Sequence, residues 1–267
     1  MVDDANILHV EQTDKGVLRL TMDDQNSRNA LSEAMMKSLI EELTKASSND
    51  SVRVVIIASN GPVFSAGHDL KEITAVRNQN DFGEEYFEKL FDTCSALMKL
   101  IVACSKPVIA EVSGVATAAG CQLVASCDLA TAADSARFAT PGVNIGLFCS
   151  TPMVALSRNV NKKHAMEMLL TGDMIDAKKA KEIGLINNYF HISELAKETM
   201  TLANKIASKS SMTVSIGKNA FYSQSDLDLS SAYEYTSKVM VENMLKEDAE
   251  EGIGAFIEKR PPRWRDK

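Results

Sequence analysis

Hydrophobic residues change their spacing along this chain, and the first third alternates between strand-like and helix-like patterns. Val17–Met22 and Val52–Ala58 are rich in β-branched residues, and the second run is almost wholly apolar, as in a strand covered on both faces. Between them, Ser32 is placed to cap an amphipathic stretch that continues to about Ser47. The pattern predicts a strand, a helix and a second strand.

A similar alternation continues through the middle of the chain. Asn60-Gly61-Pro62 interrupts it, and a loop of small residues at Ser65–His68 follows. The pattern then predicts a helix over about Glu84–Val102, strands at Pro107–Val112 and Leu129–Ala132, and between these strands a short apolar helix that ends near Ser126.

Beyond Thr151 the pattern becomes almost entirely helical. Helical periodicity is present at Lys163–Leu170, Ala177–Ile183, Ser193–Ser208, Met212–Phe221, Leu229–Leu245 and Asp248–Glu258. No low-complexity linker separates this part from the first, and no repeat is legible in the sequence. We therefore expect an α/β half followed by a helical half.

Composition excludes several classes of protein. The 267 residues fit one large domain, or one domain with a helical appendage. Apolar residues make up 45% and charged residues 24%, which is usual for a globular protein with a full core. A net charge of -7 argues against a nucleic-acid or membrane surface, and no apolar run approaches the roughly 20 residues of a membrane span.

Cysteine and histidine positions argue against disulfide and metal frameworks. The chain has five cysteines, an odd number without a C-x-x-C pair, so we expect buried, reduced thiols. Its four histidines are scattered, so we expect no metal site. The opening Met1–Asp4 lacks an Arg/Ser-rich leader, which taken alone favours the cytosol.

Short motifs in a fixed order point to a known family. They lie at Ser27–Ser32, Phe64–Leu70, Lys106–Ala110, Ser113–Leu123, Cys127–Asp128, Ala165–Asp173, Ala180–Ile186 and Gly254–Arg260. In these motifs the chain resembles the enoyl-CoA hydratase/isomerase (crotonase) superfamily over nearly its whole length.

The resemblance implies a fold, an assembly and a ligand. The implied fold is α/β, a crotonase (ClpP-like) spiral of ββα units in residues 1–200, with a C-terminal helical trimerisation region in residues 201–267. The implied assembly is a homotrimer or a dimer of trimers. The implied ligands are coenzyme A thioesters, and no cofactor is expected. The resemblance also implies a role in mitochondrial fatty-acid metabolism.

The resemblance also assigns an oxyanion hole to the backbone N–H groups of His68 and Ala119. Ala119-Gly120 precedes a short predicted helix, whose N-terminus presents free N–H groups and partial positive charge. Taken alone, the loop at Ala118–Gly120 is a tight turn of small residues. Its pairing with the loop at Ser65–Asp69, in the family's order, favours the functional interpretation.

Further positions are expected along the coenzyme A path by resemblance. They are Arg28, Ala30, Ala66, His68, Asp69, Leu70 and Ala119. Phe256, Lys259 and Arg260 of a neighbouring subunit would approach the phosphates, since cations suit that place. For Lys259 and Arg260, ordinary solvated surface charge is an equal alternative.

Two positions argue against the family's usual chemistry. The two glutamates of a hydratase fall on Gln122 and Gly142. A carboxamide does not exchange protons at neutral pH and glycine has no side chain, whereas positioned proton transfer contributes on the order of 10²–10⁴ in rate. We therefore expect classical hydration to be weak or lost, and replacement of both residues by glutamate to create measurable hydration.

Three groups are candidates for other chemistry. His68 resembles the corresponding residue of malonyl-type CoA decarboxylases in the same superfamily, so decarboxylation over the oxyanion hole is the alternative function. An equally good interpretation is that the imidazole has no role and only the backbone N–H of His68 is used. Cys149 and Ser150 can reach the same cavity but lack a recognisable triad, so a packed cysteine is the default. Glu111 ends a buried strand, where it either enters the site or forms a salt bridge.

Overall fold

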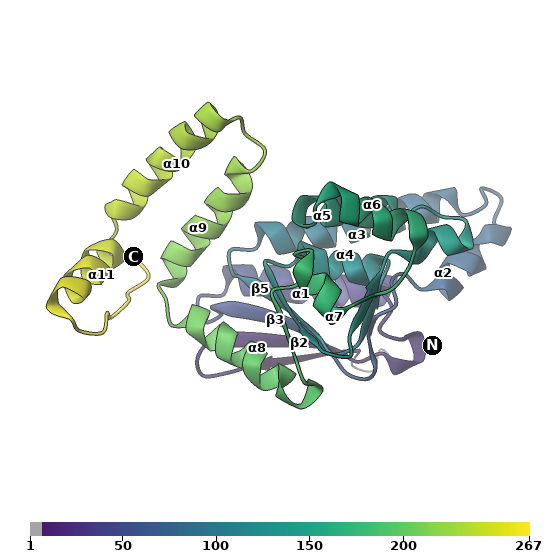
Figure 1. Cartoon of the computed structure of the whole chain (residues 1–267), viewed down its shortest axis with the longest axis horizontal. Coiled ribbons are helices and arrows are strands. Elements are labelled where there is room, and N and C mark those ends of the chain that lie inside the picture. Colours follow the sequence, from purple (N-terminus) through teal and green to yellow (C-terminus); the bar gives the residue numbers. More distant parts are fainter. Residues whose placement is uncertain (1–6) are drawn as a thin grey trace.

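The computed structural model describes residues 7–267, in which two sheets and their covering helices form the larger part of the molecule (Figure 1). Met1–Asp4, on which the expectation about a leader rests, lies outside the described residues. Within residues 7–267, no helix combines the length and the apolar character that crossing a bilayer requires.

The first sheet has six strands and is parallel except at one edge. Its order is β1 (Leu8–Gln12), β2 (Val17–Met22), β3 (Val54–Ser59), β5 (Val108–Val112), β7 (Leu129–Ala133) and β10 (Asn188–Phe190). Among the strands of this sheet in residues 7–267, β1 and β2 form the one antiparallel pair. The near-continuous apolar sequence of β3 is explained by this position, because the strand is covered on both faces.

The second sheet has four shorter strands. Its order is β4 (Val63–Ser65), β6 (Val115–Thr117), β8 (Arg137–Ala139) and β9 (Ile175–Asp176), with β9 antiparallel to β8. Consecutive strands alternate between the sheets: β3 then β4, β5 then β6, and β7 then β8. A helical segment follows each pair, so the expected spiral of ββα units is confirmed, including a repeat that the sequence hides.

Helices enclose both sheets. They are α1 (Glu33–Ser48), α2 (Leu70–Ala75), α3 (Glu84–Ala103), α4 (Ala119–Ser126), α5 (Ser150–Asn159), α6 (Lys162–Thr171), α7 (Ala177–Glu182) and α8 (Ile192–Ala207). Short 3₁₀ turns lie at η1 (Gln25–Ser27), η2 (Val76–Asn78) and η3 (Pro141–Ile145). Ser32 caps α1 as predicted, accepting a hydrogen bond from the Met35 N–H at 3.2 Å.

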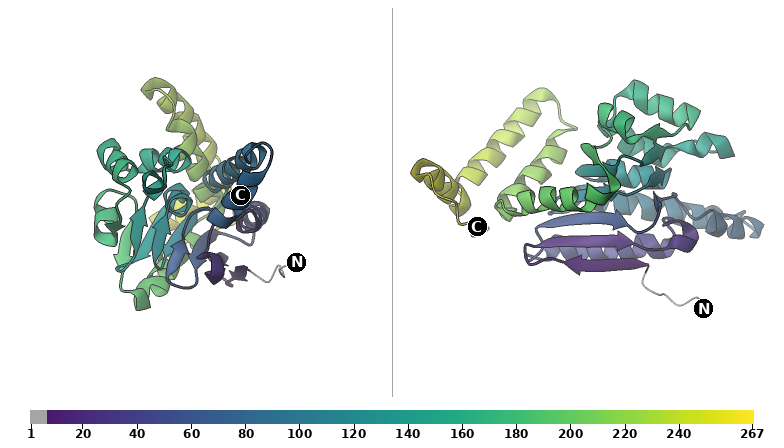
Figure 2. Two further views of the ribbon diagram at one scale, coloured as in Figure 1. Left: turned by 90° about the vertical axis from the view of Figure 1, so that its right-hand side faces the viewer. Right: turned by 60° about the horizontal axis from the view of Figure 1, so that its bottom comes forward.

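Side chains on the two faces of the first sheet belong to two hydrophobic clusters. Val54 and Ile56 of β3 pack with Ala203 and Ala207 of α8, whereas Val55 and Ile57 belong to the larger core that contains the α1 residues. α8 therefore covers one face of this sheet and α1 covers part of the other (Figure 2). Because side chains alternate with a period of two along a strand, each face needs its own cover.

The last three helices form an arm that projects from this core. They are α9 (Ser211–Gln224), α10 (Leu229–Met244) and α11 (Glu247–Glu258) (Figures 1 and 2). Lys218 of α9 anchors the arm: its ammonium donates to the carbonyls of Ile101 and Lys106, and to Asp128 at 2.7 Å. The Tyr222 hydroxyl donates to the same Asp128 carboxylate at 2.8 Å, so Asp128 holds the arm against the core.

All five cysteines are free and buried, as predicted. Across residues 7–267, no group of three or more His, Cys, Asp or Glu side chains is arranged to hold a metal ion. The thiols are therefore part of the packed interior, where cysteine behaves as a small apolar side chain.

Candidate functional site

Three neighbouring strands of the second sheet carry the candidate site at their carboxyl ends. The segment Ala66–Asp69 follows β4, Ala118 connects β6 to α4, and Thr140–Gly142 follows β8. Because β4, β6 and β8 are adjacent and parallel, their carboxyl ends meet at one edge of the sheet. Ligands of parallel sheets commonly bind at such an edge.

Two glycines allow the first two segments to touch. A Cβ at Gly67 would stand 2.9 Å from the Ala118 Cβ, and Gly67 has a φ of +92°, which favours glycine. A Cβ at Gly120 would stand 2.3 Å from the Ser65 carbonyl oxygen. Thr117 closes the contact, since its hydroxyl donates to the Ala66 carbonyl at 3.1 Å. The sequence therefore packs these loops more tightly than larger residues would permit.

Ala118 holds a strained backbone conformation at this contact. Its φ of 50° and ψ of -118° lie outside the regions that residues with a Cβ normally adopt. Such outliers cost of order 1–3 kcal/mol and gather at functional sites, because surrounding structure must enforce them. The strain places the Ala119 N–H at the first position of α4, where an N–H has no partner within its own helix.

A cavity of about 670 Å³ opens beside these segments. Ala66, His68, Leu70, Ala118 and Ala119 line one part of it, and residues of the segment 141–152 line most of the rest. Apart from the His68 imidazole, no lining residue within the described chain carries a carboxylate, ammonium or guanidinium group: the remaining side chains are apolar, small, amide, hydroxyl or thiol. The volume suits a small-molecule ligand, for which mostly apolar clefts of about 300–1,000 Å³ are typical.

The backbone N–H groups of His68 and Ala119 both belong to residues that line this cavity. Neither N–H donates to another group within the part of the chain that the structure describes. Two free N–H donors on touching loops can stabilise a carbonyl oxygen that gains negative charge. The residues assigned by resemblance to an oxyanion hole are thus brought together at one cavity.

The imidazole of His68 is neutral in this environment. Its Nδ1 lies 3.2 Å from the Leu31 carbonyl oxygen, which only accepts, so Nδ1 carries the proton. Nε2 is then an acceptor; it is buried without a partner. Burial lowers the pKa of His68, and the bond to Leu31 opposes this only in part.

Neither lost-glutamate position supplies a proton-transfer group. Gln122 is buried in the core, outside the cavity lining, with its Oε1 3.8 Å from the Cys94 sulfur. Gly142 lines the cavity, but a Cβ there would stand 2.6 Å from the Leu147 carbonyl oxygen and 2.9 Å from the Cys149 sulfur. Residues 147–149 thus occupy the space that a side chain on residue 142 would need. This geometry argues against the expectation that Gln122→Glu with Gly142→Glu creates hydration.

Cys149 and Ser150 line the cavity without the features of activated nucleophiles. The Cys149 sulfur accepts a hydrogen bond from the Gly142 N–H at 3.3 Å. Burial raises the pKa of this thiol, and that hydrogen bond offsets the effect only in part. The Ser150 hydroxyl donates to the Phe148 carbonyl at 3.3 Å instead of to a base. The default of a packed cysteine is confirmed.

Glu111 forms a salt bridge and does not enter the site. Both of its carboxylate oxygens accept from the guanidinium of Arg19, one of them at 3.0 Å. Glu111 is 5% exposed and is absent from the cavity lining. Of the two interpretations of this residue, the salt bridge is confirmed.

The other residues expected along the ligand path divide into two groups. Leu70 and Ala66 line the cavity, whereas Arg28, Ala30 and Asp69 do not. The Asp69 carboxylate caps α2 by accepting from the Lys71 N–H at 2.7 Å. The residues assigned to a neighbouring subunit lie at the end of the arm: Phe256 is exposed, Lys259 follows the last residue of α11, and Arg260 is paired with Glu251 and Glu258.

Two parts of the lining were missed by reasoning from the sequence. Ile73 lies three positions after the motif Phe64–Leu70, in a short helix that the sequence pattern did not predict. Phe91 lies within the predicted helix over Glu84–Val102, whose pattern does not mark it as a site residue. The apolar run Ile145–Phe148 forms part of the rim with exposed side chains. An apolar run next to two site loops was a usable signal for this segment.

The fold and this site define a crotonase-type protein with a paired-amide cavity. An enoyl-CoA hydratase/isomerase family model matches residues 12–267, and the chain belongs to that family. Mitochondrial enoyl-CoA hydratase domain-containing protein 3 of Xenopus laevis is 48% identical over 257 residues, covering 96% of this chain and 86% of the relative.

Solved structures agree with this assignment. The crystal structure of human enoyl-CoA hydratase domain-containing protein 3 matches with a TM-score of 0.92 at 48% identity, over 97% of this chain and 100% of that one. Enoyl-CoA hydratase of Mycobacterium smegmatis matches with a TM-score of 0.92 at 46% identity, over 97% and 98% of the two chains.

Proposed function

We propose that this protein binds acyl-CoA thioesters in its cavity with the thioester oxygen between the N–H groups of His68 and Ala119, and that it hydrates enoyl-CoA weakly or not at all. Two such donors would hold the oxygen as it gains charge, at roughly 3–4 kcal/mol per donor in well-studied enzymes. The apolar remainder of the cavity suits an acyl chain.

The absence of a carboxylate from the described cavity lining carries this proposal. Hydration needs one group to take a proton from water and another to deliver a proton to carbon. Gln122 points away into the core, Gly142 has no side chain, and His68 offers one neutral imidazole whose Nε2 is covered. These features support a protein that binds the ligands of the family without the family's proton-transfer groups.

Decarboxylation of a malonyl-type CoA is less well supported than binding alone. A substrate carboxylate would enter a cavity whose lining, within residues 7–267, includes no Lys or Arg. Burying an unpaired anion is costly. The lowered pKa of His68 keeps its imidazole uncharged at neutral pH, so it would not offset that cost.

The proposal extends to assembly and location. The arm of α9–α11 carries large exposed apolar side chains, among them Leu229, Tyr233, Val241, Leu245 and Phe256. Such a surface is typical of a protein interface, and the homotrimer or dimer of trimers expected from the family would cover it. Because curated relatives are named as mitochondrial proteins, we also propose a mitochondrial protein of fatty-acid metabolism.

Binding of butanoyl-CoA, measured by isothermal titration calorimetry, tests the ligand class. Gly67→Ala adds a Cβ that meets Ala118 at a φ suited to glycine, so it should separate the two N–H donors and weaken binding at least ten-fold. Gly217→Ala is the matched control, because a Cβ at Gly217 meets no atom within 4 Å.

Two results would count against the proposal. One is wild-type protein that binds neither butanoyl-CoA nor crotonyl-CoA. The other is equal butanoyl-CoA binding by the folded Gly67→Ala and Gly217→Ala variants. Release of carbon dioxide from methylmalonyl-CoA, lost in His68→Ala, would favour the decarboxylase instead.

A further inference from the structure

The residues that follow α11 make more contacts than a free chain end needs. Residues 261–267 contain no helix or strand, and they turn back after α11 so that the C-terminus lies near the start of that helix (Figures 1 and 2). Chain ends of this kind are usually poorly ordered unless contacts tie them down. This one contacts the start of α11, the corner between α8 and α9, and Arg53, which directly precedes β3.

Asp248, at the start of α11, holds the last residues of the chain. Its carboxylate accepts hydrogen bonds from the N–H groups of Arg265 at 2.7 Å and Asp266 at 3.0 Å. Its own N–H donates to the Lys267 carbonyl at 3.1 Å. Asp248 is 2% exposed, and a buried charge is tolerated only where such donors meet it. The chain end is therefore bound to a buried carboxylate.

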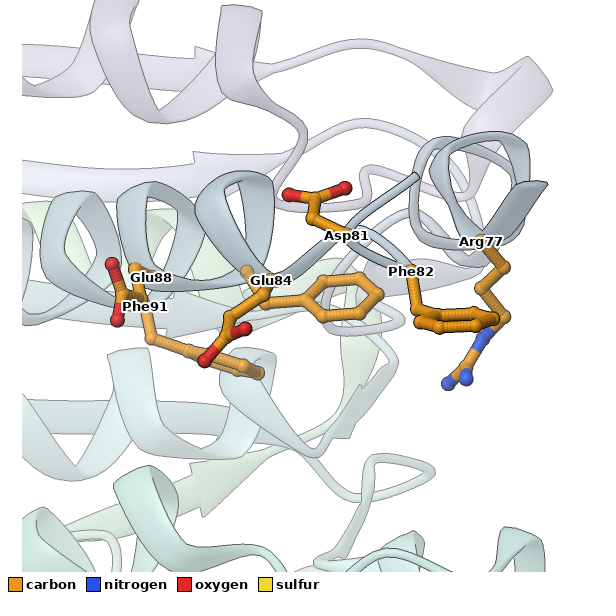
Figure 3. A pocket seen from close by; sticks show the side chains of 7 residues that line it. Arg77, Asp81, Phe82, Glu84, Glu88 and Phe91 are labelled. Carbon is orange, nitrogen blue, oxygen red and sulfur yellow. The ribbon is translucent and has the colours of Figure 1, made fainter. Parts of the chain in front are cut away.

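The donors to Asp248 come from a separate segment of the chain. An aspartate that accepts backbone N–H groups often shapes only its own turn. Asp81, labelled in Figure 3, does so before α3, where it accepts from the N–H groups of Gly83 and Glu85. Asp248 instead accepts from residues 17 and 18 positions away. Its contacts therefore join two segments and do more than shape a turn.

Asp266 connects the chain end to the core. Its carboxylate accepts from the Ser211 N–H at 2.6 Å and pairs with the Arg53 guanidinium at 3.0 Å. The same guanidinium donates to the carbonyls of Ala207 at 2.7 Å and Lys209 at 2.6 Å. A planar guanidinium can meet several acceptors in one fixed geometry. Arg53 thus binds both the chain end and the corner through which the arm leaves the core.

Trp264 makes a second connection at the same corner. Its indole N–H donates to the carbonyl of Ser208, the residue that follows α8, at 2.9 Å. Its ring lies against Gly252 of α11, where an added Cβ would stand 3.2 Å from two ring atoms. The indole therefore lies between α11 and the end of α8.

These contacts close the arm into a loop. Lys218 fixes α9 to the core, and α10 and α11 continue the arm outwards (Figure 1). Residues 261–267 then return to the start of α9, so α11 is tied to the rest of the molecule through them as well as through α10. α11 exposes Ile253, Phe256 and Ile257. Exposed apolar residues of this size suit contact with another protein surface.

We propose that residues 261–267 are a strap that fixes α11 against the core, so that α11 is already in place when it meets a second copy of the chain. This inference rests on the proposed oligomer, because it gives the strap a task within that assembly. Without the strap, α11 would be attached through α10 and would lose its freedom to move each time subunits associate. Fixing α11 in advance lowers that cost and slows the separation of subunits.

Subunit exchange in the full-length protein tests the strap. Unlabelled and heavy-isotope-labelled protein are mixed, and native mass spectrometry follows the appearance of mixed oligomers. Trp264→Ala with Asp266→Ala removes both connections to the corner and should speed subunit exchange at least about ten-fold. Asp266→Asn keeps an acceptor for the Ser211 N–H but loses the charge that pairs with Arg53, so it should give a smaller increase.

Lys267→Ala is the matched control. Within residues 7–267, Lys267 contributes its backbone carbonyl to the strap and not its side chain, so this variant should exchange subunits at the wild-type rate. Amide hydrogen exchange is the second measurement. In the double variant it should become faster at residues 208–211 and in α11, and stay unchanged in β3 and β5.

The outcomes separate the strap from the proposed function. If the wild type is oligomeric and the double variant exchanges subunits at the wild-type rate, the strap is overturned and the proposed function stands. If the double variant does not fold, Asp266→Asn decides in the same way. Equal acceleration by Lys267→Ala also overturns the strap. A wild type that forms no oligomer overturns the proposed assembly and the strap together, while butanoyl-CoA calorimetry still tests the ligand.

Discussion

A methyl group at Gly142 should disturb the site more than its size suggests. The Cβ of Gly142→Ala would stand 2.6 Å from the Leu147 carbonyl oxygen and 2.9 Å from the Cys149 sulfur. Ordinary contact begins near 3.4 Å, so the backbone at Leu147 must retreat by about 0.8 Å, the difference between 3.4 and 2.6 Å. Two hydrogen bonds resist that movement: Leu147 N–H to the Gly142 carbonyl at 2.9 Å, and Gly142 N–H to the Cys149 sulfur at 3.3 Å.

The expected cost follows from overpacking. Added methylenes in a packed region typically cost 1–3 kcal/mol, and a backbone oxygen yields less readily than a side chain. We expect Gly142→Ala to lower the free energy of unfolding by about 2 kcal/mol. Urea unfolding followed by circular dichroism measures this change. Gly217→Ala is the control and should be neutral or slightly stabilising, because that glycine lies inside a helix with open space around it.

The same reasoning predicts the outcome of rebuilding a hydratase. Gln122→Glu with Gly142→Glu should not produce hydration of crotonyl-CoA, because the second glutamate displaces the chain at 147–149 and the first stays in the core near Cys94. Absorbance loss of crotonyl-CoA is the assay. Full stability of Gly142→Ala, or clear hydration by the double glutamate variant, would refute the argument from this loop.

Three further predictions concern charge. Because burial lowers the pKa of His68, the unfolded chain binds the proton more readily, so the free energy of unfolding should fall as the pH drops below about 6.5. The difference between the urea midpoints at pH 7.5 and pH 5.5 should therefore be smaller in His68→Gln than in the wild type. An unchanged difference would contradict the lowered pKa. Glu111→Leu alone should lower the free energy of unfolding by about 3 kcal/mol, because it leaves the Arg19 guanidinium unpaired. The double variant Arg19→Met/Glu111→Leu should recover most of that loss in urea unfolding. Equal losses in the single and double variants would contradict the pairing. Lys218→Met should lower the free energy of unfolding by about 3 kcal/mol and speed amide hydrogen exchange in α9, because Asp128 and two carbonyls lose their donor. Unchanged hydrogen exchange in α9 would show that other contacts hold the arm.

Long, regular patterns in the sequence gave the most reliable predictions. Val17–Met22 is the strand observed, and the predicted helix over Glu84–Val102 differs from α3 by one residue. Helical periodicity also located α10 within one residue at its end. These segments are long enough for burial on one face to determine their type.

Short strands were missed for a physical reason. β4 and β6 contain three residues each, too few for alternation to be distinguished from a loop. They nevertheless create the site, because their pairing brings residues 66–69 next to residues 118–119. That proximity became predictable only through the family's motif order.

The direction of individual side chains lay beyond the sequence. Nothing in the neighbourhood of Gln122 distinguished a cavity residue from a core residue, and Phe91 lies in a stretch that reads only as an amphipathic helix. Glu111 could be resolved only by its partner Arg19, which lies 92 positions away in the chain. Tertiary packing decides such questions, and one sequence contains no record of it.

Hydration of crotonyl-CoA by wild-type protein that binds butanoyl-CoA is the most direct measurement of the central claim. We expect saturable binding of butanoyl-CoA by calorimetry. We also expect the protein to hydrate crotonyl-CoA on the order of 10²–10⁴ times more slowly than a glutamate-bearing hydratase of the family assayed in parallel. Turnover equal to that hydratase would contradict the account, because it would require a second proton-transfer group besides His68, which the cavity lining of residues 7–267 does not contain.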